Sequence, residues 1–545
     1  MKRTLFLLLC TVCYFSSFSR DYYEGQRTSW LQKAKSNIPH LMISEHKPKA
    51  LVQIVPDDHA FQGWKAQALA PADSLYQASF KSRSGVVVDF GEHLTGYFSF
   101  RIDTLAGTPD AHLRFRCTFG EVPSEIATPF DPYPGGLSRA WLQDEVVTVT
   151  EIPALITIPR RVAFRYVKIE LLGSSPWFDV KLSEMTCRAQ TSARETPEEL
   201  PASVPEIFRK IDQVGLNTLK ECMQTVYEDG AKRDQRLWLG DLYLESLANI
   251  HSYKQHDLTR RCLYLLAGIS APDGYLFATA FEKPEPHPQE SQLFLDYALL
   301  FNVALKDYYE ATQDMETAKD LWIVAKKQLD VVPEYLTADG LMDYAKADEK
   351  WTIFFDWNDQ LYKEIALQGI TIYALEETYR LAKLLGMEKE VSAYPAWIRQ
   401  MRSAARKAWY EKKTGLFIHP AHRQVSYTSQ VWMVLGGVVT GREAQQALKV
   451  LPTLPDVCKP GTPYAYHYYI QALIHCGLQA EVRQAVETYW GGMVKKGADT
   501  FWEINDPENE FLSPYGFFPI NSYCHAWSCT PVYFIRKYPA IFAGK

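Results

Sequence analysis

The chain has 545 residues, of which 47% are hydrophobic and 22% are charged. This is the composition of an ordinary globular protein, and the length allows two or more domains with sizeable cores. The formal net charge is −6 and no basic run stands out, so nucleic acid and anionic membrane surfaces are not expected as partners.

The N-terminus has the pattern of a secretory signal. Two basic residues precede an apolar run over residues 4–15, and the small residue Ser19 offers a cleavage point. The run is too short for a comfortable membrane span. We expect residues 1–19 to be removed, the mature protein to begin near Arg20, and its location to be the periplasm or the cell surface, without stable membrane insertion.

Ten cysteines occur in the chain, and two of them lie in this N-terminal segment. The other eight are scattered and include no C-x-x-C pair. A zinc site is therefore not expected, and buried free thiols are the default interpretation.

Short alternating runs separated by Gly and Pro dominate residues 61–190 and predict β-strands. The expected strands are residues 86–90, 97–101, 112–117, 146–150, 166–170 and 178–182. They predict a β-sandwich domain over residues 20–195. Residues 20–60 show no clear element.

Helical periodicity begins after a Pro- and Glu-rich stretch at residues 196–201. Apolar residues recur at three- and four-residue spacings in eleven segments. These segments are residues 205–226, 241–266, 291–312, 315–332, 363–385, 391–410, 428–439, 442–450, 464–476, 479–493 and 522–536. About twelve helices without a short repeat predict an (α/α)6 barrel over residues 196–545 rather than a solenoid.

One stretch concentrates groups that can do chemistry. Asp229-Gly-Ala-Lys-Arg-Asp-Gln-Arg-Leu-Trp-Leu-Gly-Asp241 holds three carboxylates, three cations and a tryptophan. Its glycines argue against a continuous helix, and the apolar run that follows predicts a helix capped by Asp241. A sugar site needs a proton donor, hydroxyl partners and a stacking surface. The alternative interpretation of this stretch is a solvated charged loop.

Three segments in order along the chain resemble the α-L-rhamnosidases of glycoside hydrolase family 78. Residues 229–241 are similar to the acidic signature of that family, and Gly497-Ala-Asp-Thr-Phe-Trp-Glu503 is similar to its G-A-T-T-x-W-E segment. Ser522-Tyr-Cys-His-Ala-Trp527 resembles the S-x-C-H-x-W segment on the closing helix. Residues 89–96 and 164–167 resemble the jelly-roll domain that precedes the barrel. A C-terminal β-domain, found in many members, is not expected because the chain ends after the last predicted helix.

The resemblance implies hydrolysis of a terminal α-L-rhamnosyl linkage of plant or microbial glycans, with inversion. In inverting enzymes two carboxyl groups stand about 6.5–9.5 Å apart, one as acid and one as base that activates water. The resemblance assigns Asp234 as the general acid and Glu503 as the general base. The acid is commonly Glu in the family, so the shorter Asp234 requires a closer approach of the substrate. No cofactor or metal is expected, because water and two carboxylates suffice.

The other predicted site residues would bind the sugar. Asp229 and Asp241 match acidic positions that bind hydroxyls and tune the acid, and Arg233 would hold these carboxylates in place. Trp238 and Trp502 would form an apolar wall for the C6 methyl group.

Two further places have both a functional and a structural interpretation. Asp356 and Trp357 lie in a segment that resembles the G-D-W segment of the family and would contact the deoxysugar, although Trp357 could equally be a core residue. His525 would bind the sugar from the last helix, although a lone His in an aromatic helix is more often a core residue.

Two alternatives to a rhamnosidase stay open. The same barrel could act on another sugar, or eliminate from an acidic polysaccharide with the aid of the aromatic patch at residues 464–468. The protein could also be a noncatalytic carbohydrate-binding protein in which Asp234 has ended turnover. An oligosaccharide or polysaccharide is the expected partner in each case.

Overall fold

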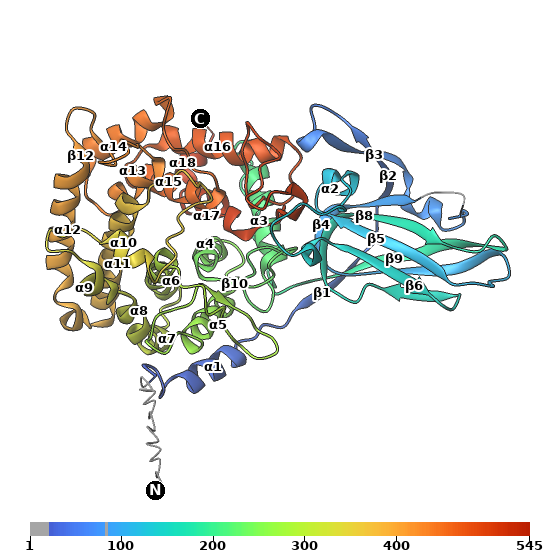
Figure 1. The fold of residues 1–545 in the computed structure, drawn as a ribbon, viewed down its shortest axis with the longest axis horizontal. Helices are drawn as coiled ribbons and strands as arrows, with labels where there is room; N and C mark the ends of the chain where they lie inside the picture. Colours follow the sequence, from blue (N-terminus) through green and yellow to red (C-terminus); the bar gives the residue numbers. More distant parts are fainter. Residues whose placement is uncertain (1–20, 82–84, 545) are drawn as a thin grey trace, which may run out of the picture.

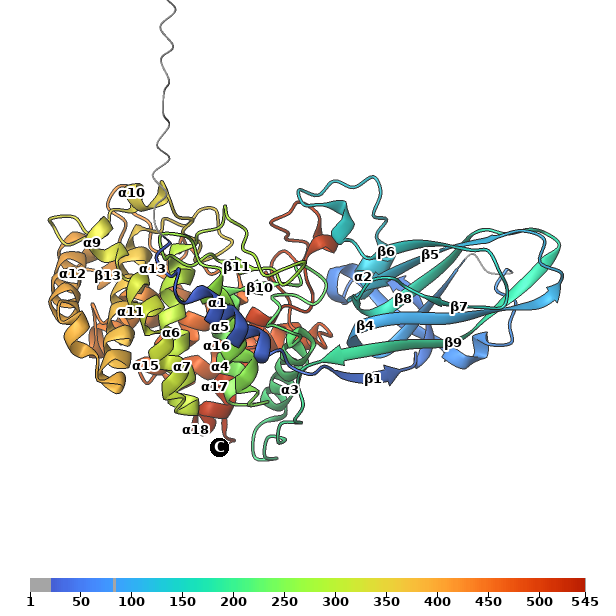
Figure 2. The same ribbon diagram turned by 90° about the horizontal axis from the view of Figure 1, so that it is seen from below.

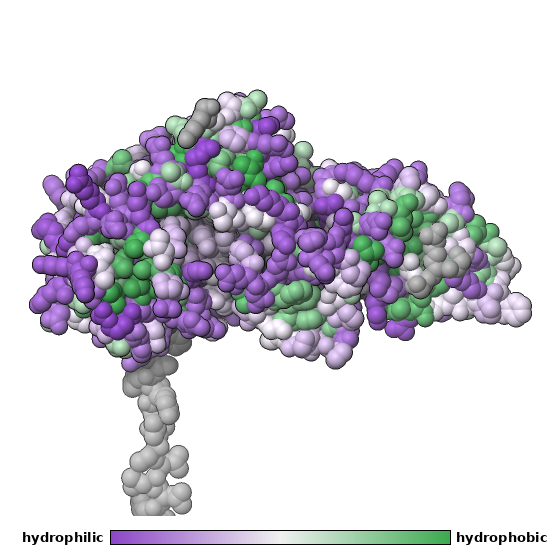
Figure 3. Space-filling model, turned by 90° about the horizontal axis from the view of Figure 1, so that it is seen from above, coloured by the Kyte–Doolittle hydropathy of each residue, from purple (hydrophilic) through white to green (hydrophobic). Residues whose placement is uncertain are grey.

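The computed structural model describes residues 21–81 and 85–544 and has a helical half and a β-rich half that lie end to end (Figures 1 and 2). The predicted signal peptide lies outside the described residues. Among the helices that are described, none is long and apolar enough to cross a membrane. Figure 3 shows a mostly hydrophilic face in which apolar side chains gather in separate patches.

The β-rich half is an antiparallel β-sandwich, as predicted. Its described strands are β1 (Met42–His46), β2 (Ala50–Pro56), β3 (Trp64–Pro71), β4 (Val86–Gly107), β5 (Leu113–Gly120), β6 (Asp144–Val149), β7 (Ala154–Thr157), β8 (Val162–Gly173) and β9 (Phe178–Thr191). They pair in the order β1-β9-β4-β8-β5-β6, and β2 and β7 also pair with β4. β4 combines two predicted strands in one, because its pairing with β8 shifts register between Asp89 and Leu94 without ending the strand.

The helical half is the expected (α/α)6 barrel. Its helices are α3 (Glu206–Cys222), α4 (Leu239–Ile250), α5 (His256–Gly268), α6 (Leu295–Thr312), α7 (Met315–Asp320), α8 (Trp322–Gln328), α9 (Val331–Tyr335), α10 (Tyr344–Asp348), α11 (Glu364–Leu385), α12 (Tyr394–Trp409), α13 (Tyr427–Leu435), α14 (Gly441–Val450), α15 (Pro463–His475), α16 (Gln479–Lys495), α17 (Pro531–Lys537) and α18 (Pro539–Phe542). α4, α6, α11 and α13 are buried on nearly every side, as inner helices must be, whereas α12 and α14 each bury one stripe.

Several predicted helices are divided in the structure. The segment 241–266 contains α4 and α5, separated by a turn, and 315–332 contains α7 and α8. The segment 522–536 contains only a single 3-10 turn, η7 (Ala526–Ser528), followed by α17. His525 therefore precedes the last helices instead of lying on one.

Residues 27–36, which the sequence analysis placed in the sandwich domain, form the helix α1 (Arg27–Ser36). Trp30 and Ala34 are buried in the core of the barrel half. The Arg27 guanidinium donates to the carbonyl oxygens of Ser270 at 2.7 Å and Ala271 at 2.9 Å, just after α5. The helix is mostly polar and is held by contacts distant in sequence, which explains why no periodic pattern indicated it.

Candidate active site

Three segments that are far apart in the sequence meet at one end of the barrel. The Ala526 N–H donates to the carbonyl oxygen of Asp229 at 2.7 Å, which joins the loop after α3 to the loop before α17. The Glu503 N–H donates to the carbonyl oxygen of Ser522 at 2.9 Å. The segments 229–241, 497–503 and 522–527, singled out by sequence, are thus bonded to one another through their backbones.

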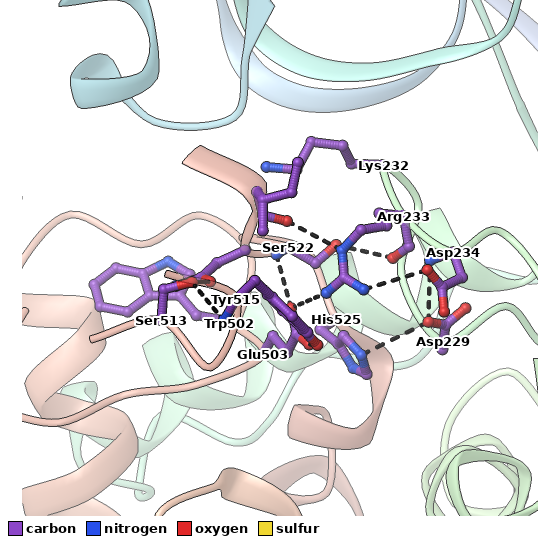
Figure 4. A network of polar contacts seen from close by, with 12 residues as sticks. Asp229, Lys232, Arg233, Asp234, Trp502, Glu503, Ser513, Tyr515, Ser522 and His525 are labelled. Atoms are coloured by element: carbon purple, nitrogen blue, oxygen red, sulfur yellow. Dashed lines mark hydrogen bonds and ion pairs between the residues drawn. The ribbon is translucent and has the colours of Figure 1, made fainter. Parts of the chain in front are cut away.

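The Glu503 carboxylate is held by three donors (Figure 4). Its Oε2 accepts from Arg233 at 2.5 Å and from the Ser522 N–H at 2.9 Å, and its Oε1 accepts from the Tyr515 hydroxyl at 2.5 Å. Burial would raise the pKa of Glu503, but the Arg233 charge and the hydrogen bonds from Arg233 and Ser522 together outweigh burial and hold this pKa at about 2. Glu503 is therefore an oriented, ionised carboxylate.

Arg233 connects Glu503 to the Asp229–Asp241 stretch. Its other terminal nitrogen lies 3.2 Å from Asp234 Oδ1, so one guanidinium spans the gap between the two predicted catalytic carboxylates. The Arg236 guanidinium contacts the other oxygen of Asp234 at 3.3 Å. The Asp234 side chain keeps 13% exposure, against 5% for Asp229 and 3% for Asp241. Asp234 is thus the carboxylate of this stretch that a substrate reaches most easily.

Asp229 and Asp241 lie deeper in the same pocket. The Asp229 carboxylate accepts the N–H groups of Asp234 at 3.1 Å and Arg236 at 3.3 Å. Burial, reinforced by the neighbouring Asp234 charge, raises the pKa of Asp229 to about 8. Burial also raises the pKa of Asp241 well above its usual range, and Asp241 Oδ1 has no hydrogen-bond partner. Asp241 lies in the first turn of α4, which begins at Leu239, so it does not cap the helix as predicted.

His525 lies between these two acids. Its ring nitrogens are 3.9 Å from Asp229 and 3.8 Å from Asp241, too far for direct hydrogen bonds. Burial lowers the pKa of His525 to about 4, so the ring is neutral at physiological pH. Its Nδ1 has no partner. The floor of the pocket therefore presents several polar groups that no other side chain satisfies.

Aromatic side chains close the rest of the pocket. Trp238 and Trp357 line it, as predicted from sequence. The structure adds five residues that sequence analysis did not assign to the site: Phe294, Tyr297, Phe354, Tyr515 and Trp527. Trp527 belongs to the segment 522–527 that the sequence analysis singled out. Phe294 and Tyr297 lie at the start of α6, at the end of this inner helix that faces the pocket. Tyr515 lies in an irregular loop that carries no pattern.

Two predicted binding residues do not line the pocket. The Trp502 ring points away from the carboxylates (Figure 4) and stacks on Phe61 at 3.9 Å between ring centroids. The Asp356 carboxylate accepts from the Gly461 N–H and the Thr462 hydroxyl, both at 2.7 Å, and ties two loops together. Both are buried structural residues in the free protein.

Two other predictions concern groups outside the pocket. The aromatic patch at residues 464–468 includes Tyr464 and Tyr468, which are buried in the barrel core. Tyr466 is half-buried, and none of these three tyrosines lines the pocket. Within residues 21–81 and 85–544, no group of three His, Cys, Asp or Glu side chains is arranged to hold a metal ion. The eight cysteines described are all free, and six of them are buried.

Comparisons with known proteins identify the family. Residues 48–189 match the glycosyl hydrolase family 78 alpha-rhamnosidase N-terminal domain, and residues 203–538 match the bacterial alpha-L-rhamnosidase 6 hairpin glycosidase domain. No match is found among curated proteins. A solved rhamnosidase from Klebsiella oxytoca with rhamnose bound is 40% identical, with a TM-score of 0.90, over 94% of this chain and 99% of that chain.

More distant structures share the fold. A family 78 rhamnosidase of Bacillus sp. GL1 is 20% identical, with a TM-score of 0.71, over 88% of this chain and 50% of that chain. An α-L-rhamnosidase from Dictyoglumus thermophilum is 18% identical, with a TM-score of 0.64, over 91% of this chain and 52% of that chain. At these identities the likeness concerns the fold alone. The two family matches and the 40% identity lead to one conclusion: the chain belongs to glycoside hydrolase family 78, the α-L-rhamnosidases.

Proposed function

We propose that this α-L-rhamnosidase removes terminal rhamnosyl residues by an inverting mechanism, with Asp234 as general acid and Glu503 as general base. The observation that carries the proposal is the Arg233 bridge. Both carboxylates face one pocket, and the Arg233 guanidinium lies between them and contacts each. A gap of that kind suits the water molecule that an inverting enzyme must hold between its second carboxylate and the sugar.

The different surroundings of the two carboxylates support the division of roles. A base must be ionised before the reaction, and the low pKa of Glu503 meets that condition. The leaving group departs toward solvent, so the acid must be reachable from the pocket mouth, and Asp234 is the most exposed of the three aspartates. Asp229 is the competing acid, because its pKa of about 8 keeps it protonated at neutral pH. Its two backbone hydrogen bonds and its burial favour a supporting role.

Leaving-group dependence separates these assignments. Asp234→Asn should lose about 10²–10⁴ in rate on rhamnosides with poor leaving groups and much less on activated aryl rhamnosides, which need no proton. Glu503→Gln should lose activity on both, and azide should restore part of it. Equal losses for Asp234→Asn on both substrates, with leaving-group dependence in Asp229→Asn, would transfer the acid role to Asp229.

The stereochemistry has its own test. Proton NMR during the first minutes of hydrolysis should show β-L-rhamnose before the anomers equilibrate. Initial release of the α-anomer would contradict inversion.

We also propose export, supported by the signal-like N-terminal sequence. N-terminal sequencing of protein from the native host should find a start near Arg20. Cytosolic protein that retains Met1 would contradict export.

A further inference from the structure

A second hollow begins at the mouth of the catalytic pocket. Trp357 lines both hollows. Beyond it, three loops form a groove that we call the Trp357 groove, with Tyr466 of α15 at its side. These loops are residues 357–360, 459–461 and 505–508. A sugar chain whose terminal unit fills the catalytic pocket would leave past Trp357 and enter this groove.

Trp357 is unusually accessible for so large an apolar side chain. It is 39% exposed, although its ring also packs edge-on against Phe354 at 5.1 Å and Tyr515 at 5.9 Å. These contacts hold the ring while part of it remains open to solvent. A fixed and partly exposed indole at a pocket mouth is a stacking surface for the apolar face of a sugar ring.

The groove also offers polar groups that the protein itself does not use. In the described part of the chain, the side chains of Asp359, Gln360 and Asn505 and the Tyr466 hydroxyl make no hydrogen bond or ion pair with other residues. Carboxylates, amides and a phenol supply both donors and acceptors. Free groups of this kind around an exposed ring can bind the hydroxyl groups of a second sugar.

The charges of the groove are unequal. It carries three carboxylates, those of Asp359, Asp506 and Glu508, and a single ammonium group, that of Lys459. Lys459 Nζ already lies 3.9 Å from Glu508. A second sugar with its own carboxylate would therefore meet repulsion, which exposed charges exert over several ångströms and which salt weakens.

We propose that the Trp357 groove is the subsite for the sugar to which rhamnose is attached, and that it selects neutral sugars over uronic acids. This inference rests on the proposed function, since it requires the terminal rhamnosyl unit to occupy the catalytic pocket. The inference adds to that function the chemical class of the sugar to which rhamnose is attached.

Three matched substrates test the selection: rhamnosyl-glucose, rhamnosyl-glucuronic acid and the methyl ester of the latter. We expect kcat/KM for the acid to be about tenfold below that for glucose, and the ester to recover most of the difference. The ester has nearly the shape of the acid without its charge. Raising the ionic strength should reduce the difference in kcat/KM between the acid and its ester.

Two variants then test whether the carboxylates of the Trp357 groove cause the difference in kcat/KM between acid and ester. Asp359→Asn combined with Glu508→Gln should bring the ratio between acid and ester to within about twofold of unity. The control Asp110→Asn removes an exposed carboxylate from the sandwich half and should leave the ratio as in the wild type. Equal cleavage of acid and ester by the wild type, or a ratio that the double variant does not change, would overturn the proposal. Absence of rhamnose release from every substrate, aryl rhamnosides included, would instead overturn the proposed function.

Discussion

Two clusters of buried ionisable side chains share the Asp229–Asp241 stretch, and they differ in how their polar groups are satisfied. One is the floor of the catalytic pocket, formed by Asp229, Asp241 and His525. The other, which we call the interdomain cluster, joins the sandwich to the barrel. Its members are His93, Glu121, Glu125, Glu221 and Lys232.

In the interdomain cluster the cations lie beside carboxylates, although His93 Nδ1 and Glu221 Oε2, 3.6 Å apart, form no hydrogen bond. Lys232 Nζ lies 2.7 Å from Glu125 and 3.1 Å from Glu121. Glu121 also contacts His93 at 3.0 Å and accepts the Tyr523 N–H at 2.6 Å. Burial opposes a charged imidazole, but Glu121 and Glu221 outweigh it and raise the pKa of His93 to about 10. Each buried cation of the cluster therefore faces carboxylates.

The pocket floor is the opposite case. Asp241 Oδ1 and His525 Nδ1 have no partners, and neither does either carboxyl oxygen of Glu245, one turn further along α4. Leaving buried polar groups unpaired costs about 1–3 kcal/mol each, so a fold does not retain them without a reason. We propose that the ion pairs of the interdomain cluster fix the position of the loop, whereas Asp241 and His525, which line the pocket, bind hydroxyl groups of the sugar.

The two clusters are directly connected. Lys232 precedes Arg233, which bridges the catalytic carboxylates, and Tyr523 follows Ser522, whose N–H binds Glu503. A single turn of the sandwich, from Glu121 to Glu125, thus holds both catalytic segments. The sandwich is therefore part of the support of the active site.

Breaking the paired cluster should have the largest effect on stability. Lys232→Met removes the buried ammonium group that Glu121 and Glu125 share, and we expect a loss of about 3–5 kcal/mol in the free energy of unfolding, measured with urea. Adding Glu125→Gln to this variant should recover part of the loss. The control Lys496→Met removes an exposed pair with Glu510, worth about 0–1 kcal/mol. Similar losses in Lys232→Met and the control would contradict the comparison.

Asp229 should make stability depend on pH in a defined direction. Its pKa is about 8 in the folded protein against an ordinary value of 3.8, so between these values the folded state holds a proton that the unfolded state lacks. Its contribution is fully present below pH 4 and is lost as pH rises to about 8. Asp229→Asn removes this pH-dependent contribution, so the melting temperature of the variant relative to wild type should increase from pH 5 to 8. A constant difference would show that Asp229 is ionised throughout.

Glu245 should give the smallest effect. Burial raises its pKa well above the usual range, and the neutral carboxyl group has nearly the shape of an amide. Glu245→Gln should therefore change the free energy of unfolding at pH 7 by less than about 0.5 kcal/mol. A loss of several kcal/mol in the free energy of unfolding would mean that Glu245 is ionised and has a partner. Glu245 would then resemble the carboxylates of the interdomain cluster.

The sequence predicted the architecture and the meeting of Asp234 with Glu503, because ordered motifs locate segments even when they are far apart. It failed for Trp502 because a motif match does not show which way each side chain points. Glu503 faces the pocket, whereas its neighbour Trp502 stacks on Phe61. Tyr515 could not be predicted, because its place beside Glu503 depends on an irregular loop. The interdomain cluster also required the fold, since Glu121 and Lys232 are more than a hundred residues apart.

Binding of L-rhamnose to Asp241→Asn, measured by isothermal titration calorimetry at pH 7, tests the central claim most directly. Rhamnose is the released sugar, so no turnover obscures the titration. If the unpaired groups of the pocket floor bind the sugar, the variant should fold as stably as wild type, within about 0.5 kcal/mol, and bind rhamnose at least about tenfold more weakly. Unchanged affinity in a stable Asp241→Asn variant would contradict the claim that these groups are left unpaired for the substrate.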